Sequence, residues 1–166
     1  FPQSQISFGQ LSIKEGLSQN CGISVAQDST GYLWIATQDG LNKYDGTNFV
    51  VYPFIFDDIT RLDYSHLGKV YVDRQNQVWC IPSSRILNRL DQNNDRFEPI
   101  ALTDDASVIY QDQDLGYWVG TYSKGLLYSK MNDSVPKVQN IGQIKETIYA
   151  LAQYETAILA ATDNGI

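Results

Sequence analysis

Three aspartates stand at the same distance before a tryptophan, and both residue types could bind a ligand. The pairs, each separated by six positions, are Asp28 and Trp34, Asp73 and Trp79, and Asp112 and Trp118. Repeated carboxylates could bind calcium, and repeated tryptophans could stack on sugar rings. The structural alternative is that each Asp caps a turn through hydrogen bonds to the backbone, while each Trp packs between neighbouring repeats. We favour this alternative, because the repeats keep the aspartates far apart and each Trp holds a fixed position in a strand.

No other group in the sequence has the context of a catalytic residue. The only histidine, His66, has no second histidine or Cys-x-x-Cys pair near it, which excludes an ordinary zinc site, and we assign it to a loop or the surface. A sialidase-type Asp-box has its glycine two positions after the aspartate, whereas Gly31 comes three positions after Asp28. The paired carboxylates and tyrosine nucleophile of a glycosidase are also missing. We therefore assign no catalytic, cofactor-binding or metal-binding residue, and the ligand-binding residues stay unknown.

One irregular stretch, from Pro53 to Tyr64, combines aromatic and acidic residues. In it, Phe54-Ile55-Phe56 is followed by Asp57-Asp58. Loops held by a rigid scaffold often carry binding residues, so a binding role is one interpretation. Packing of the aromatic side chains under the rim of the fold is the interpretation that we favour.

The composition is that of a soluble globular protein with an acidic surface. Of 166 residues, 43% are hydrophobic and 19% are charged, and the net charge is −7. Such a surface repels phosphates and no Lys/Arg cluster offsets it, which excludes a nucleic-acid partner. No apolar run reaches the length of about 18 residues that a membrane span needs. The two cysteines, Cys21 and Cys80, are too few for a disulfide framework, and we expect Cys80 to be a small buried side chain.

The aspartate–tryptophan pairs belong to an internal repeat with a period of about 40 to 45 residues. Nine positions before each Trp stands an aliphatic residue, Val25, Val70 or Ile109, and a fourth, weaker copy replaces Trp with Leu159. The first copy holds four short alternating stretches separated by turns, of which Asp28-Ser29-Thr30-Gly31 is the first. Asp-Gly steps supply the positive φ that tight hairpins demand. Because no stretch has a helical period over more than about three turns, the repeat predicts four-stranded propeller blades rather than a helical solenoid.

The chain is therefore predicted to be all-β, a partial β-propeller of about three and a half four-stranded antiparallel blades. Residues 1–16 contain a lone strand, from Ile6 to Ile13, that is placed to close the ring by completing the last blade. The predicted ranges are 17–61 for blade 1, 62–101 for blade 2, 102–143 for blade 3 and 144–166 for an incomplete blade 4. Blade 2 departs from the pattern at its second turn, where Pro82-Ser83-Ser84 replaces Thr-x-x-Gly.

Two stretches of the first copy are typical of one known repeat. They are Gly16-Leu17-Ser18-Gln19-Asn20 and the run from Gln27 to Gly46, QDSTGYLWIATQDGLNKYDG. Both resemble the two-component regulator propeller repeat. Blades 2 and 3 match this repeat in part, and the fourth copy lacks its tryptophan. The lead-in Phe8, Leu11 and Ser12 also resembles the start of the mature sensor in that family.

The resemblance implies a location and a role. In that family the repeats form the extracytoplasmic sensor of hybrid two-component histidine kinases, which are common in gut Bacteroidetes such as Bacteroides. Two seven-bladed propellers would lie in the periplasm, joined through a further β-domain and one transmembrane helix to the kinase. The usual cue is an oligosaccharide from polysaccharide breakdown. No ligand residue is carried over, because the family's ligand residues do not form a short motif.

Three and a half blades cannot close a seven-bladed ring, so we expect a segment whose partners are the remaining blades and downstream domains of the same polypeptide. The outer faces of the first and last blades would then expose apolar side chains. We expect two copies to associate by covering each other's open ends. The segment itself is expected not to be an enzyme. The alternatives for its function are a piece of a carbohydrate-active propeller enzyme, a lyase or glycosidase, and a protein-interaction propeller.

Overall fold

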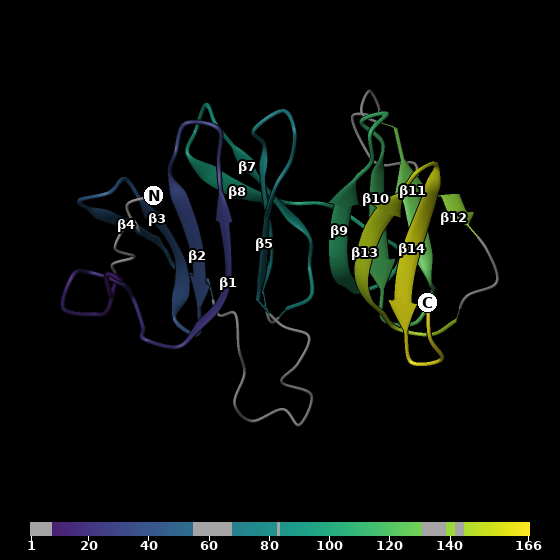
Figure 1. The fold of residues 1–166 in the computed structure, drawn as a ribbon, viewed down its shortest axis with the longest axis horizontal. Helices are drawn as coiled ribbons and strands as arrows, with labels where there is room; N and C mark the ends of the chain where they lie inside the picture. The colour runs from purple at the N-terminus through teal and green to yellow at the C-terminus, as the bar shows by residue number, and fades with distance from the viewer. Residues whose placement is uncertain (1–7, 55–67, 83, 131–138, 142–144) are drawn as a thin grey trace, which may run out of the picture.

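The computed structural model describes residues 8–54, 68–82, 84–130, 139–141 and 145–166 (Figure 1), and all regular structure in these residues is β. The first two sheets are blade 1, with β1 (Gly22–Gln27), β2 (Leu33–Thr37), β3 (Gly40–Tyr44) and β4 (Phe49–Tyr52), and blade 2, with β5 (Lys69–Val72), β6 (Val78–Ile81), β7 (Asn88–Asp91) and β8 (Arg96–Pro99). The next two are blade 3, with β9 (Ala106–Gln111), β10 (Tyr117–Thr121), β11 (Leu126–Ser129) and β12 (Gln139–Ile141), and blade 4, with β13 (Ile148–Tyr154) and β14 (Ala157–Thr162).

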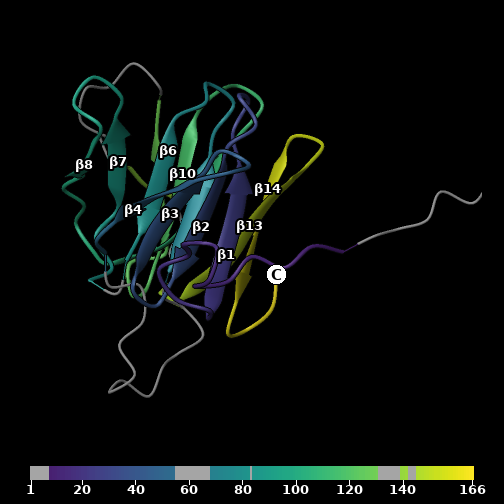
Figure 2. The same cartoon turned by 90° about the vertical axis from the view of Figure 1, so that its left-hand side faces the viewer.

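Each sheet is an antiparallel meander in which consecutive strands pair. In Figure 1 blades 1, 2 and 3 follow one another from left to right, with blade 4 in front of blade 3, and in Figure 2 the sheets overlap along the line of sight. The first strand of each sheet contacts the first strand of the next, so β1 contacts β5, β5 contacts β9 and β9 contacts β13. This arrangement places the first strands innermost. It confirms the prediction of a partial propeller with about three and a half blades.

The sheets lie inside the four predicted blade ranges. The ends of those ranges fall partly on residues 55–67 and 142–144, which lie outside the described part, and therefore stay predictions. In blade 1 the four short stretches expected in the first copy are the four observed strands, β1 to β4. The agreement reflects the strong local signals, since Gly31, Gly40 and Gly46 all have positive φ in the turns that separate these strands.

Neighbouring blades are held together by apolar side chains that project from facing sheets. Between blades 1 and 2, Trp34 packs with Tyr52 of its own sheet and with Phe97 of β8. Between blades 2 and 3, Trp79 lies against Tyr117 of β10. Burial of this apolar surface is the main stabilising contribution, and it is shared between blades rather than contained within one.

The segment before blade 1 corrects one expectation. A strand was predicted from Ile6 to Ile13, but the described residues 8–13 are not in a strand. Instead, the Ser12 backbone N–H donates to the Glu15 carboxylate at 2.7 Å and the Glu15 N–H donates to the Ser12 carbonyl at 3.0 Å, which makes a turn. None of the described strands pairs with residues 8–13, and a strand without a partner leaves its backbone groups unpaired.

The turn leads into a short segment that covers the outward face of blade 1. Leu17 is buried there, and the Ser18 backbone N–H donates to the side-chain oxygen of Asn42 at 2.9 Å. The side-chain amide of Asn42 donates back to the Ser18 hydroxyl at 2.9 Å, and Asn42 is completely buried. The segment Gly16-Leu17-Ser18 is therefore fixed to β3 by the Ser18–Asn42 hydrogen bonds, and we call this segment the clasp.

Blade 4 departs from the repeat at its first turn. Gln153 stands where the other blades have Asp, and Leu159 stands where they have Trp. The connection from β13 to β14 is a two-residue turn, with Tyr154 paired to Ala157 and Glu155 at positive φ. This shorter hairpin has no indole N–H to satisfy, which accounts for the missing aspartate.

Both cysteines are unpaired, with Cys80 completely buried and Cys21 exposed. Burial raises the pKa of the Cys80 thiol, so it behaves as a small apolar side chain. In the part of the chain that the structure describes, no helix has the length and apolar character to cross a membrane.

Candidate ligand-binding site

The three repeated aspartates cap the first turn of their blades. The Asp28 carboxylate accepts the backbone N–H groups of Thr30 and Tyr32, both at 3.0 Å. In blade 2, Asp73 accepts the N–H groups of Gln75 and Gln77 at 2.9 and 2.8 Å. The equivalent bonds to Asp112 come from the backbone of Asp114 and Gly116 at 2.9 and 2.8 Å. The structural interpretation of these residues is confirmed.

Each aspartate also uses its second oxygen, in a contact that sequence reasoning missed. The indole N–H of the Trp six positions later donates to this oxygen, at 3.0 Å for Trp34, 2.9 Å for Trp79 and 2.7 Å for Trp118. A buried indole N–H requires an acceptor. The constant spacing of six positions was the available signal, since it places the Asp at the first turn and the Trp two residues into the returning part of the chain, close to it.

The environment of Asp28 keeps its carboxylate charged. Burial of the Asp28 carboxyl favours its neutral form, but the hydrogen bonds from Thr30, Trp34 and Tyr32 outweigh burial, so its pKa is lowered. Within the described residues, no three His, Cys, Asp or Glu side chains are grouped so that they could hold a metal ion. His66 and the acidic pair Asp57-Asp58 lie outside the described residues, so their roles stay predictions.

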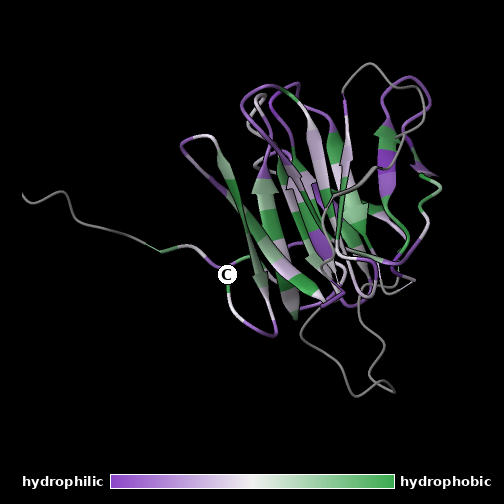
Figure 3. Cartoon of the chain, turned by 90° about the vertical axis from the view of Figure 1, so that its right-hand side faces the viewer, coloured by the Kyte–Doolittle hydropathy of each residue, from purple (hydrophilic) through white to green (hydrophobic). Residues whose placement is uncertain are grey.

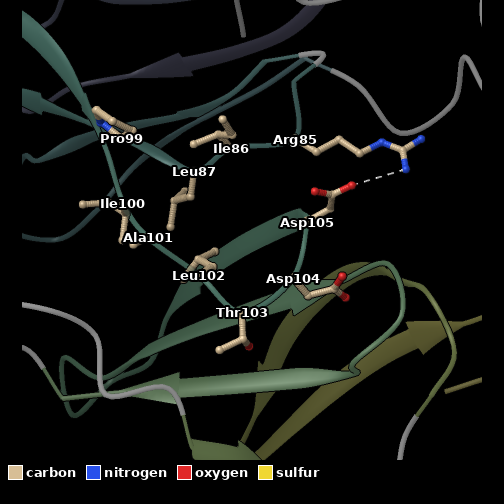
Figure 4. Close-up of a pocket in the computed structure, with 10 residues that line it drawn as sticks. All are labelled: Arg85, Ile86, Leu87, Pro99, Ile100, Ala101, Leu102, Thr103, Asp104 and Asp105. Carbon is tan, nitrogen blue, oxygen red and sulfur yellow. Dashed lines mark ion pairs between the residues drawn. The ribbon is translucent and has the colours of Figure 1, made fainter.

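A pocket lies between blades 2 and 3 on a different part of the molecule. It is lined by residues 85–87, which lead into β7, and by residues 99–105, which connect β8 to β9 (Figure 4). Its cavity volume is about 630 Å³, within the range of roughly 300–1,000 Å³ that small-molecule sites occupy. Apart from Pro99, which ends β8, these residues lie outside the strands. Binding residues are found in loops more often than in strands.

Arg85 is the residue with the most unusual geometry in this pocket. It has a φ of 60°, which is rare for a long side chain outside a hairpin turn. The guanidinium lies 4.0 Å from the centre of the Tyr122 ring in blade 3 and 3.8 Å from the Asp105 carboxylate. The Arg85 side chain is 12% exposed, whereas that of Asp105 is 56% exposed. Arg85 thus joins the two blades, while the Asp105 side chain stays partly exposed. The ion pair between Arg85 and Asp105 is drawn as a dashed line in Figure 4.

The neighbouring Asp104 fixes the loop of blade 3 beside the pocket. One of its carboxylate oxygens accepts the backbone N–H groups of Ser123 and Lys124 at 2.8 and 2.9 Å, and also the Ser123 hydroxyl at 3.0 Å. Burial favours the neutral form of Asp104, but these hydrogen bonds outweigh it and its pKa is lowered. Asp104 is therefore an anion at neutral pH.

A second, smaller hollow adjoins this pocket. Its volume is about 370 Å³, and its lining includes residues 53 and 54 after β4 together with Pro82 and Ser84. Ile86 and Pro99 line both hollows. The expectation that the Pro53 to Tyr64 stretch packs under the rim holds for Phe54, whose ring meets that of Phe97 at 5.2 Å between centroids.

Sequence reasoning did not identify Arg85 or its pocket. The lining residues come from two separate loops, and only the fold brings these together. One signal was available, because Pro82-Ser83-Ser84 stands where blade 1 has Thr37-x-x-Gly40 and blade 3 has Thr121-x-x-x-Gly125. In those blades the Thr hydroxyl donates to the glycine carbonyl, at 3.1 Å for Thr37 and 2.8 Å for Thr121. Blade 2 has no such Thr–Gly pair in the stretch that precedes Arg85.

Solved structures share the fold of this chain. The extracellular domain of the hybrid two component system BT3049 from B. thetaiotaomicron superimposes with a TM-score of 0.74 and 24% identity, over 93% of this chain and 24% of that one. The extracellular domain of the one component system BT4673 from the same organism has a TM-score of 0.72 and 17% identity, over 98% of this chain and 25% of that one. The resemblance of the first copy to the two-component regulator propeller repeat agrees with these structural similarities.

One curated protein is related in sequence. Histidine kinase P4 from Formosa agariphila is 41% identical over 59 residues, which are 36% of this chain and 4% of the kinase. No protein-family model matches the chain. The chain thus spans about a quarter of the structural neighbours' length, and the matched segment covers a small part of the kinase.

Proposed function

We propose that this chain is part of the extracytoplasmic sensor propeller of a hybrid two-component histidine kinase and contributes to the recognition of a carbohydrate-derived ligand. The observation that carries the proposal is the fold, shared over 93% of the chain with the extracellular domain of such a system. The sequence likeness to a histidine kinase supports the same assignment. On this proposal the segment lies in the periplasm, outside the inner membrane, and the kinase lies elsewhere on the same polypeptide.

The pocket between blades 2 and 3 is the proposed place of ligand contact. A ligand seated there touches the loop of Arg85 and the connection at Asp104 and Asp105, and so bridges two blades. The blades are already coupled at this point, because the Ala106 backbone N–H donates to the Arg85 carbonyl at 2.9 Å. Binding energy gained at the pocket therefore changes how rigidly blade 2 is held on blade 3, which is the kind of change that a sensor transmits.

A propeller enzyme that acts on carbohydrate is the alternative in a different class. It requires a pair of carboxyl groups facing the substrate, with one of them raised in pKa to act as the acid. In the described part, Asp104 has a lowered pKa and is engaged by Ser123 and Lys124. The pocket geometry thus favours binding over hydrolysis.

Calorimetry with product analysis tests the proposed function. The purified chain is titrated with neutral oligosaccharides, acidic oligosaccharides, amino acids and short peptides, and each mixture is then analysed for breakdown. We expect saturable binding of at least one saccharide with no new product. Product formation would favour the enzyme, and binding only to peptides would favour an interaction propeller.

The Arg85→Ala variant localises the binding site. Loss of the Arg85 link to Tyr122 and Asp105 is expected to weaken binding by about tenfold or more, because it removes a lining residue and loosens the two loops. Lys145→Ala is the matched control, since Lys145 is exposed and lies outside the lining of the pocket. Equal affinity of Arg85→Ala and the unchanged chain would remove the pocket from the proposal.

A further inference from the structure

The two hollows share Ile86 and Pro99 in their linings, and we name the two together the rim groove. We propose that the rim groove binds a linear chain of uncharged sugar rings, with Ile86 and Pro99 between two subsites. This inference rests on the proposed function and narrows its ligand to one class. It stands on the shared lining of the hollows, on the charges at the rim, and on the apolar floor.

The shared lining favours an extended ligand over a compact one. The larger hollow has a volume of about 630 Å³ and the smaller one about 370 Å³. Both contact Ile86, whose side chain is 47% exposed, and both contact Pro99. A single ring leaves one hollow to water, whereas an extended chain passes over Ile86 and fills both. Affinity is therefore expected to rise with chain length.

The charges of the rim favour hydroxyl groups over anions. The lining of the larger hollow carries the Arg85 guanidinium and the carboxylates of Asp104 and Asp105, so its net charge is negative. Arg85 is already close to Asp105, and Asp104 stays ionised at neutral pH. A carboxylate or sulfate on the ligand would meet like charge in a protein whose net charge is −7. A sugar hydroxyl instead donates to the exposed Asp105 carboxylate.

The floor of the groove favours rings with an apolar face. It consists mainly of apolar residues that precede β7, end β8 or follow it, which are Ile86, Leu87, Pro99, Ile100, Ala101 and Leu102 (Figure 4). The C–H face of a pyranose ring packs on such side chains while its hydroxyls point to the rim. An apolar floor with few polar groups at its edge is the general composition of a ligand site.

The chain-length series tests the extended groove. The purified chain is titrated by calorimetry with neutral xylo-, manno-, gluco- and galacto-oligosaccharides, from monomers to hexamers, and with oligogalacturonates of the same lengths. We expect at least one neutral series to gain about tenfold or more in affinity between monomer and tetramer, because both hollows become filled. The oligogalacturonates are expected to bind more weakly than the neutral chain of equal length.

The Ile86→Asp variant tests the position of the groove. A charged side chain between the subsites is expected to lower the affinity for the neutral tetramer by about tenfold or more while leaving the monomer less affected. Val51→Asp is the matched control, because Val51 is 44% exposed on β4 and lies outside both hollows. The thermal midpoint of each variant shows that it is folded, since both side chains are exposed in the unchanged chain.

The outcomes separate this inference from the function on which it rests. Tighter binding of the oligogalacturonates, or equal affinity for monomer and hexamer, would overturn the rim groove and leave carbohydrate sensing intact. Loss of tetramer binding in Val51→Asp but not in Ile86→Asp would place the site elsewhere and likewise overturn it. If no saccharide of either series binds, the rim groove and carbohydrate sensing both fail.

Discussion

At the scale of residues, one carboxylate organises the first turn of each of blades 1 to 3. Asp28 accepts two backbone N–H groups with one oxygen and the Trp34 indole with the other. Asp73 takes a further bond, since the Tyr117 hydroxyl of blade 3 donates to it at 2.6 Å. The aspartate therefore links the turn, the buried aromatic ring and, in blade 2, the adjacent blade. Such a buried acceptor is costly to remove because several donors depend on it.

Asp28→Asn should destabilise the chain even though the shape of the side chain is kept. An Asn side chain has one acceptor oxygen, so either the turn amides or the Trp34 indole N–H faces an NH2 group. We expect the free energy of unfolding to fall by about 1–3 kcal/mol, measured by urea denaturation. Asp39→Asn makes the same change of charge at an exposed position and should have little effect. Equal losses in the two variants would show that charge alone matters.

Acid should weaken the fold through the carboxylates of Asp28 and Asp104. The folded-state pKa values of Asp28 and Asp104 are lowered from their ordinary value of 3.8, because hydrogen bonds outweigh burial. A lowered pKa contributes stability that is fully present above the unfolded value and is lost as pH falls through the folded value. We expect the free energy of unfolding to decline below pH 3.8. Asp28→Asn should show a shallower decline, and an unchanged slope would contradict the assigned role of Asp28.

At the scale of elements, the spacing between blades 3 and 4 depends on a glycine in β10. A Cβ atom on Gly120 would lie 2.7 Å from Ile148 of β13 and 2.7 Å from Val108 of β9. Both neighbours are β-branched and stiff, and Ile148 is completely buried. A strand that must approach another sheet this closely has room only for hydrogen at that position.

Gly120→Ala should therefore separate blade 4 from blade 3. We expect a loss of about 1–3 kcal/mol in the free energy of unfolding, as for other overpacked cores. Amide exchange should rise first in β13 and β14, since these strands dock on the affected surface. Gly22→Ala on β1 is the control, because nothing lies within 4 Å of its added Cβ atom. A stable Gly120→Ala chain with unchanged exchange would show that the sheets can yield at this contact.

At the scale of the whole molecule, the two ends of the row of blades differ in how they are covered. The outward face of blade 1 carries the clasp of Leu17 and Ser18, although Val25 beside it stays exposed. The outward face of blade 4 exposes Tyr154 and Leu159, and hydrophobic residues run along this side of the molecule in Figure 3. An uncovered apolar sheet face of this kind favours association.

We expect the chain to self-associate, with two copies covering each other's open ends. Light scattering over a series of concentrations measures the mass of the particle. Leu159→Asp should shift the particle toward monomer, because it places a charge on the face of blade 4. Ile86→Asp changes a similarly exposed residue away from that face and should leave the mass unchanged. A monomer at high concentration for the unchanged chain would remove this expectation.

The sequence by itself determined the strands, the turns and the number of blades, because those features depend on neighbours within a few positions. The first turn closes between Asp28 and Gly31, and the recurrence of the aspartate at Asp73 and Asp112, six positions before a Trp, indicates repeated units. It also indicated that the aspartates are turn caps rather than metal ligands. The Asp–Trp hydrogen bond was within reach of the sequence, since its spacing never varies.

Only the tertiary structure decided where the hollows lie and which conformation the described residues before blade 1 adopt. The rim groove joins loops from different blades, and the Arg85 ring contact with Tyr122 spans a blade boundary that no local pattern describes. The expected strand before blade 1 was wrong in its described residues 8–13, because pairing depends on a partner and not on the alternation of side chains. Local signals fix hairpins, whereas pockets and edge contacts arise from which hairpins become neighbours in space.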